Sequence, residues 1–259
     1  MSIYSFYGVF FVAPFTGAWI ETFVGVIQSY VVKSRTPIDT SLIWDVSINY
    51  FRYHLRNTII FCIPFTKGII MELSHFLQHT CLIDVENRSK VVWLFTENWA
   101  RLCKTPASTR YHAPYPGGLR DHTFSVVDKS LALATLLFNN AETASGKFIS
   151  SLIKCAYLHD IGKMGTASTE MYIANPNEME RYKSPYIYNS ALLPCDHETR
   201  SLLWINRYGI SLSEEELIAI LHHGGAYQKH HDYVNPDNRH PLLIMLHSVD
   251  NLSAKILNI

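Results

Sequence analysis

Residues 151–163 read SLIKCAYLHDIGK, and this stretch decides how we interpret the chain. Its apolar residues recur at the spacing of a buried helix, which runs directly into His159 and Asp160. An aspartate is rarely buried without a partner, because a carboxylate that leaves water loses its hydration. A neighbouring imidazole together with a divalent cation would neutralise the carboxylate and satisfy its lone pairs. The stretch therefore predicts a metal site at the end of a helix.

Two ligands are too few for such a site, so others must come from elsewhere in the fold. His122 stands near the start of another predicted helix. Asp250 stands beside an apolar helix face made by Leu243, Leu246, Val249 and Leu252, where a carboxylate is otherwise hard to explain. Together with His159 and Asp160 they form a set of two histidines and two aspartates. Mixed nitrogen and oxygen ligands suit Mn, Fe, Co, Ni or Zn better than Mg.

Apolar periodicity and helix-end signals predict an all-α domain around this site. We expect helices over about 118–139, 147–160, 196–208, 213–223 and 240–256, with no competing strand pattern. Ser213 with Glu216 three residues later predicts a capping box at the start of the fourth of these helices.

Composition limits the classes of function. Lys plus Arg equals Asp plus Glu at 22 each, so no excess of positive charge attracts a long polyanion. The five cysteines, Cys62, Cys81, Cys103, Cys155 and Cys195, form no close pair. They predict buried free thiols in a reducing, cytoplasmic compartment. Ten of the 13 histidines lie between His112 and His247, which is where chemistry is expected.

Residues 1–85 are interpreted as an apolar, helical N-terminal extension, and residues 86–259 as the domain that carries the chemistry. The first 32 residues contain one charged side chain, Glu21, but lack the basic start of a signal peptide, and Pro14 interrupts any spanning helix. This segment therefore packs on the domain, on a second copy of the chain, as in a homo-oligomer, or on a bilayer. Packing within the protein is favoured over membrane contact.

The order His, then His-Asp, then Asp on successive helices resembles the HD superfamily of metal-dependent phosphohydrolases. Residues 106–123, PASTRYHAPYPGGLRDHT, are similar to the segment that opens the HD domain in YhaM-type 3′-to-5′ exoribonucleases, in relaxases of the MOBH type and in small phage and bacterial HD proteins. Residues 219–225, AILHHGG, and 246–255, LHSVDNLSAK, resemble the same proteins. The resemblance covers about residues 90–256.

The resemblance implies a helical domain whose metal ligands are His122, His159, Asp160 and Asp250. Members with a second ion take further histidines from between the HD pair and the last aspartate. The matching positions are His197 and His222, and Asp160 would bridge the two ions. Neighbours on a helix point about 100° apart, so His222 and His223 are not both expected at one ion. His222 matches the family better.

These expectations give a phosphohydrolase that cleaves a phosphate mono- or diester of a nucleotide or short oligonucleotide with water activated by one or two divalent ions. Asp160 would orient the water, and Lys163 and Arg110 would stabilise charge on the phosphate. Arg110 and His112 lie in the loop that leads to His122. The alternative is a non-catalytic, metal-binding regulatory module, or a nucleic-acid-processing accessory module of a mobile element.

Overall fold

The computed structural model describes residues 10–14, 51–55, 58–62, 67–138, 146–225 and 240–256, with side chains from residue 72 onwards. The chain divides into two compact units, Met1–His75 and Phe76–Ile259. The division therefore falls about ten residues before the boundary that we placed near residue 86. All the histidines and aspartates of the predicted site belong to the second unit.

In the first unit, the described residues form a small antiparallel sheet and one helix. Strands β1 (Phe10–Pro14), β2 (Phe51–Leu55) and β3 (Thr58–Cys62) pair in the order β1-β3-β2. The strands differ from the helical extension that we expected, because runs such as TIIFC are rich in β-branched and aromatic residues that favour extended backbone. Helix α1 (Lys67–Phe76) agrees with the expectation. The rest of residues 1–32 lies outside the described residues.

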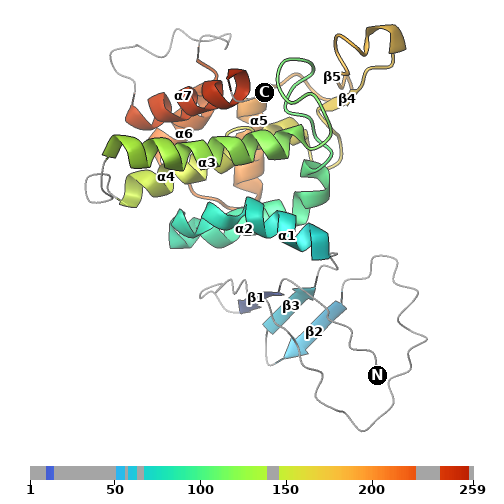
Figure 1. Ribbon diagram of the computed structural model, residues 1–259. Coiled ribbons are helices and arrows are strands. Elements are labelled where there is room, and N and C mark those ends of the chain that lie inside the picture. Colours follow the sequence, from blue (N-terminus) through green and yellow to red (C-terminus); the bar gives the residue numbers. More distant parts are fainter. Residues whose placement is uncertain are drawn as a thin grey trace, which may run out of the picture. The chain divides into compact units, whose positions relative to one another are not determined.

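The second unit is helical, which confirms the predicted all-α class (Figure 1). Its main helices are α2 (Val85–Leu102), α3 (Gly118–Phe138), α4 (Gly146–Leu158), α5 (His197–Arg207), α6 (Glu214–His222) and α7 (Pro241–Lys255). The last five agree with the predicted ranges to within two residues at each end. Within the described part of the chain, no helix is long and apolar enough to cross a membrane.

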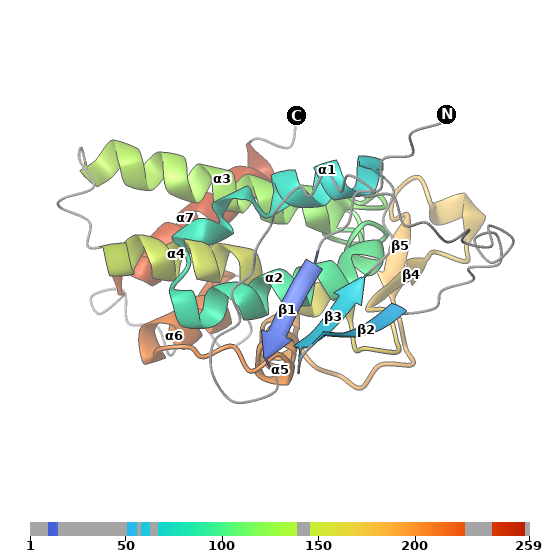
Figure 2. The same cartoon turned by 90° about the horizontal axis from the view of Figure 1, so that it is seen from below.

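Helix α4 lies at the centre of this unit, and this position explains why the sequence of α4 is so apolar. It packs against α3, α6 and α7, and the views in Figures 1 and 2 show α3, α4 and α7 side by side. Every residue from Leu152 to Leu158 is buried. A short 3-10 turn, η3 (Ile161–Met164), follows the helix and packs against α5. The stretch from which the sequence argument began is therefore the core of the domain.

Side-chain caps fix where the helices begin. Asp84 accepts a hydrogen bond from the Asn87 backbone N–H at the start of α2, and Asp196 accepts one from Thr199 at the start of α5. Ser213 and Glu216 form the capping box that the sequence predicts for α6. Because α5 and α6 start at defined residues, the positions of the histidines at their ends are defined too.

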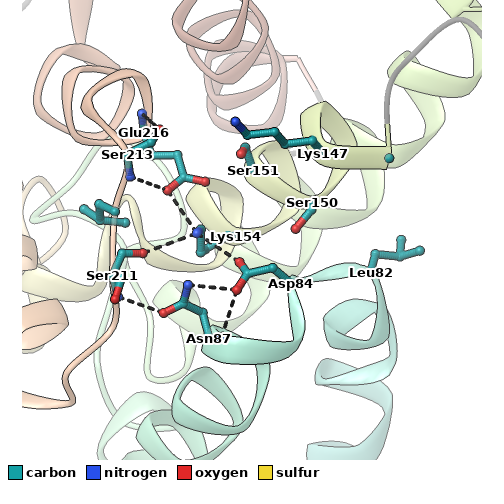
Figure 3. A pocket seen from close by; sticks show the side chains of 12 residues that line it. Leu82, Asp84, Asn87, Lys147, Ser150, Ser151, Lys154, Ser211, Ser213 and Glu216 are labelled. Atoms are coloured by element: carbon teal, nitrogen blue, oxygen red, sulfur yellow. Dashed lines mark hydrogen bonds and ion pairs between the residues drawn. The ribbon is translucent and has the colours of Figure 1, made fainter.

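One buried lysine ties three parts of the domain together (Figure 3). The Lys154 ammonium lies 3.0 Å from Asp84 Oδ2 and 2.9 Å from Glu216 Oε2, and it donates to the Ser211 carbonyl at 3.3 Å. Burial lowers the pKa of Lys154, but the two carboxylates outweigh burial and raise it. Lys154 therefore links α4 to the caps of α2 and α6.

Two features differ from the sequence expectations. The segment between η3 and α5 contains a two-stranded antiparallel sheet of β4 (Tyr172–Ala174) and β5 (Tyr186–Tyr188), where no strand was predicted. Three residues are too few for an alternating pattern to be recognised in a sequence. Cys81, Cys103, Cys155 and Cys195 are free thiols as expected, but of these only Cys155 is buried.

Candidate metal centre

Three helices and the turn after α4 bring five of the six predicted ligands to one place. His122 lies in the first turns of α3, His159 and Asp160 follow the last residue of α4, and Asp250 lies on α7. His197 is the first residue of α5. Helix ends and the adjoining turns thus supply most of these side chains, and the apolar faces of the same helices hold them in position.

The first group contains His122, His159, Asp160 and Asp250, whose candidate ligand atoms all lie within 4.8 Å of one another. His122 Nε2 is 2.9 Å from Asp250 Oδ1, 3.4 Å from Asp160 Oδ2 and 3.5 Å from His159 Nε2. His159 Nε2 is 3.4 Å from Asp160 Oδ2 and 3.7 Å from Asp250 Oδ1. Two ring nitrogens and two carboxylate oxygens therefore converge on a common point.

The second group contains Asp160, His197 and His223. Asp160 Oδ1 lies 3.1 Å from His197 Nε2 and 3.5 Å from His223 Nε2. Asp160 Oδ2 is the oxygen that faces His122 and His159 in the first group. The two oxygens of one buried carboxylate thus face two separate sets of imidazoles.

Hydrogen bonds behind the rings orient the imidazoles. His159 Nδ1 lies 2.9 Å from the Ala156 carbonyl, and His223 Nδ1 lies 2.7 Å from the Ile220 carbonyl. Because a carbonyl can only accept, Nδ1 carries a proton in both rings, and Nε2 is the atom that faces the cluster and can bind a metal ion. His197 Nδ1 lies 3.1 Å from the Glu198 carboxylate, which orients that ring in the same way.

The two carboxylates of the first group lie beside positive charge from Lys163 and from a protonated His159. Burial raises the pKa of Asp160, but Lys163 and His159 outweigh burial and hold it well below its usual range. Burial lowers the pKa of His159, but Asp160 and Asp250 outweigh burial and raise it to about 10. The two carboxylates therefore require positive charge beside them, which a divalent cation supplies as well as a protonated imidazole does.

A second observation, on Asp160, also indicates that the clustered histidines and aspartates could hold a divalent metal ion. Asp160 Oδ1 is fully buried and has no hydrogen-bond partner, although His197 and His223 approach it. An unpaired carboxylate oxygen in the interior is costly, and a cation between it and the two imidazoles would remove that cost. Nitrogen and oxygen ligands together are typical of transition metals. The cluster is therefore a candidate metal centre with room for two groups of ligands.

The structure corrects the choice between the adjacent histidines of α6. We expected His222 in the second group, but the structure places His223 there, and His222 belongs to neither group. Helix α6 ends at His222, and His223 is its C-cap residue, buried and directed at Asp160. The rotation of α6 relative to α4 decides which ring faces inward, and a sequence pattern does not record that rotation.

Lys163 and Arg110 have different surroundings. Lys163 is buried, and its ammonium lies 2.6 Å from Asp160 Oδ2, so it is not the solvated surface lysine that the sequence left open. Arg110 is exposed, donates to the Tyr111 hydroxyl and lies over the Tyr111 ring. From the same loop it is His112 that reaches the cluster, because its ring centroid is 4.8 Å from that of His122.

Comparisons of this chain with models of known protein families, with curated proteins and with solved structures find no match. The geometry of the candidate site therefore carries the functional argument. What that geometry shows is a helical domain with a buried group of histidines and aspartates that could hold a metal ion.

Proposed function

We propose that this chain is a metal-dependent phosphohydrolase of the HD superfamily, with His122, His159, Asp160 and Asp250 holding one divalent ion. The observation that carries the proposal is Asp160, whose two oxygens face two groups of imidazoles. His197, His223 and the other oxygen of Asp160 would hold a second ion. The order of these ligands on the helices supports the resemblance to HD proteins in the sequence.

Divalent cations bound in such a site activate water for attack on phosphorus and neutralise the charge that develops on the phosphate. His122, His159 and His223 are buried, and backbone carbonyls orient the rings of His159 and His223. The side chains of His197 and Asp250 are 25% and 18% exposed, more than the other ligands. Water and substrate therefore reach the centre from the side of His197 and Asp250.

Lys163 acts as a fixed positive charge behind Asp160. Its ammonium holds Asp160 Oδ2 at 2.6 Å, and burial prevents it from turning to solvent. A point charge at this position stabilises the carboxylate orientation and adds to the attraction for an anionic ester. The assignment of the ester to a nucleotide or short oligonucleotide rests on the resemblance to HD proteins, and a substrate screen tests it.

The experiment is metal analysis of purified protein together with a screen for Mn-dependent phosphatase and phosphodiesterase activity. Asp160→Asn removes the bridging charge with little change of shape, so we expect it to lose the bound metal and turnover while keeping its helix content. His223→Ala should lose about one equivalent of the two expected. His222→Ala is the matched control, and it should retain the metal content and activity of the unaltered protein.

The outcomes separate the possibilities. Equal metal loss in His222→Ala and His223→Ala would contradict the assignment of the second group. Metal bound without any turnover would favour the non-catalytic regulatory or accessory module. Absence of bound metal from the unaltered protein, after incubation with Mn, would overturn the proposed function altogether.

A further inference from the structure

The loop from Thr105 to Gly117, which leads into α3, is fixed by a dense set of hydrogen bonds. The Ser108 hydroxyl accepts from the backbone N–H groups of Tyr111 and His112, at 2.9 Å each, and donates to the His112 carbonyl at 2.8 Å. The Ala107 N–H donates to the Ala113 carbonyl at 3.1 Å. One serine therefore holds the backbone of His112 from both sides.

The residue after His112 has an unusual backbone conformation. Ala113 has a φ of 40°, and among the described residues it is the one non-glycine residue with a positive φ. A left-handed backbone is unfavourable for alanine, so the surrounding structure must impose it. Gly118 allows the Ala113 carbonyl to come this close, because a Cβ at position 118 would lie 2.0 Å from the carbonyl oxygen. The loop thus adopts a strained conformation directly beside the imidazole of His112.

The imidazole of His112 points into the candidate metal centre. Its ring packs on the His122 ring with centroids 4.8 Å apart, and its Nε2 atom is fully buried without a hydrogen-bond partner. A buried polar atom without a partner is uncommon in native proteins and calls for an explanation.

The candidate metal groups do not include His112. The ligand atoms that cluster within 4.8 Å of one another come from six other residues of the described chain. The groups whose charges act on the His112 ring are Lys163, His122, Asp160 and Asp250, and none of them forms a hydrogen bond with its Nε2 atom. A ligand that enters the centre can supply the missing partner, and an oxygen of an anionic group would accept a hydrogen bond from the ring beside the buried ammonium of Lys163.

We propose that His112 binds the substrate, with its imidazole N–H donating a hydrogen bond to an oxygen of the phosphate group. This inference rests on the proposed function and adds a residue that contacts the substrate from the loop side of the centre. The strained backbone and the Ser108 hydrogen bonds then serve to hold the donor in place before the substrate arrives. Because His112 belongs to neither group of candidate ligands, it would orient the phosphate without occupying a ligand position at the metal.

The test uses the full chain loaded with Mn and two variants, His112→Ala and His112→Gln. Inorganic phosphate is titrated calorimetrically, and kcat/KM and metal content are measured on the same preparations. A hydrogen bond to a charged group predicts that His112→Ala weakens phosphate binding and lowers kcat/KM by about ten- to hundredfold. The amide N–H of glutamine should restore part of both losses. Metal content should not change, and His79→Gln, a histidine beside Asp128, is the control.

The results distinguish failure of this inference from failure of the proposed function. If the unaltered protein binds metal and hydrolyses phosphate esters while His112→Ala binds phosphate equally well, the role of His112 alone is refuted. Loss of metal from His112→Ala would also refute it, because the residue would then act on the metal site. If the unaltered protein neither binds phosphate nor turns over substrate, both proposals fail.

Discussion

Replacing Gly162 by alanine should weaken metal binding in one group of the candidate metal centre and not in the other. Gly162 lies in η3, two residues after Asp160, and its N–H donates to the Ser201 hydroxyl at 2.9 Å. A Cβ at this position would lie 2.0 Å from the His197 carbonyl oxygen and 2.5 Å from the Ser201 nitrogen. Both are backbone atoms, so no change of rotamer relieves the clash. Helix α5 must therefore move away by more than about 1 Å to reach ordinary contact distance.

That movement is large compared with the tolerance of a metal site. His197 sits at the start of α5 with Nε2 3.1 Å from Asp160 Oδ1, whereas metal–ligand distances vary by only about 0.2 Å. The first group takes its ligands from α3, α7 and the turn after α4, so it does not depend on α5. We expect Gly162→Ala to lose about one of two metal equivalents. Overpacking of this kind costs about 1–3 kcal/mol, which lowers Tm by roughly 2–12 °C for a domain of this size.

Metal analysis and thermal denaturation of the variant measure both effects. Gly146→Ala is the matched control, because a Cβ at that position, the first residue of α4, meets nothing within 4 Å. It should leave the metal content and Tm unchanged or raise Tm slightly, since alanine favours helix. An unchanged Tm in Gly162→Ala would refute the packing argument. Loss of both metal equivalents would show that η3 moves, and not α5.

The Lys154 cluster gives two further predictions. Lys154→Met should lower the free energy of unfolding by about 3–5 kcal/mol, because it leaves Glu216 buried without its counter-charge. Lys154→Arg keeps the charge and should lower the free energy of unfolding by less. Urea denaturation measures both changes, and equal stability of the two variants and the unaltered protein would contradict the role of the ion pair. Burial raises the pKa of Asp84, but Lys154 outweighs burial and lowers it, so the stability from this pair is present above about pH 4 and is lost as pH falls through the lowered value. The urea midpoint should therefore fall less between pH 7 and pH 3 in Lys154→Met than in the unaltered protein, and parallel curves would argue against the pair.

The sequence predicted the parts of this protein that depend on local chemistry. The five helices from α3 to α7 follow from apolar periodicity, and the Ser213–Glu216 capping box follows from two residues at a fixed spacing. The first candidate metal group was predictable because a buried Asp160 requires a partner, and few residues at helix ends could supply one. The all-α class of the second unit follows from the same patterns.

The parts that the sequence did not predict depend on how elements are placed in space. His222 and His223 are equivalent by type and differ only in which way α6 presents them to Asp160. Lys163 looks like a surface residue until the burial of the turn after α4 is known. His112 carried one available signal, its place within a proline- and glycine-rich loop just before His122, but only the fold shows that its ring packs on His122.

The charge balance of the candidate metal centre also supports the proposal of an anionic substrate. Without metal, protonated His159 and Lys163 compensate Asp160 and Asp250. One divalent ion in the first group would compensate both carboxylates in place of the proton on His159, so the positive charge of Lys163 would then be in excess. A second ion would add further positive charge, which Glu198 beside His197 would offset only in part. A centre that held both ions would therefore have an excess of positive charge in a buried setting, where such an excess is costly. A phosphate ester would remove that excess, whereas a neutral ligand of the same size would leave it in place.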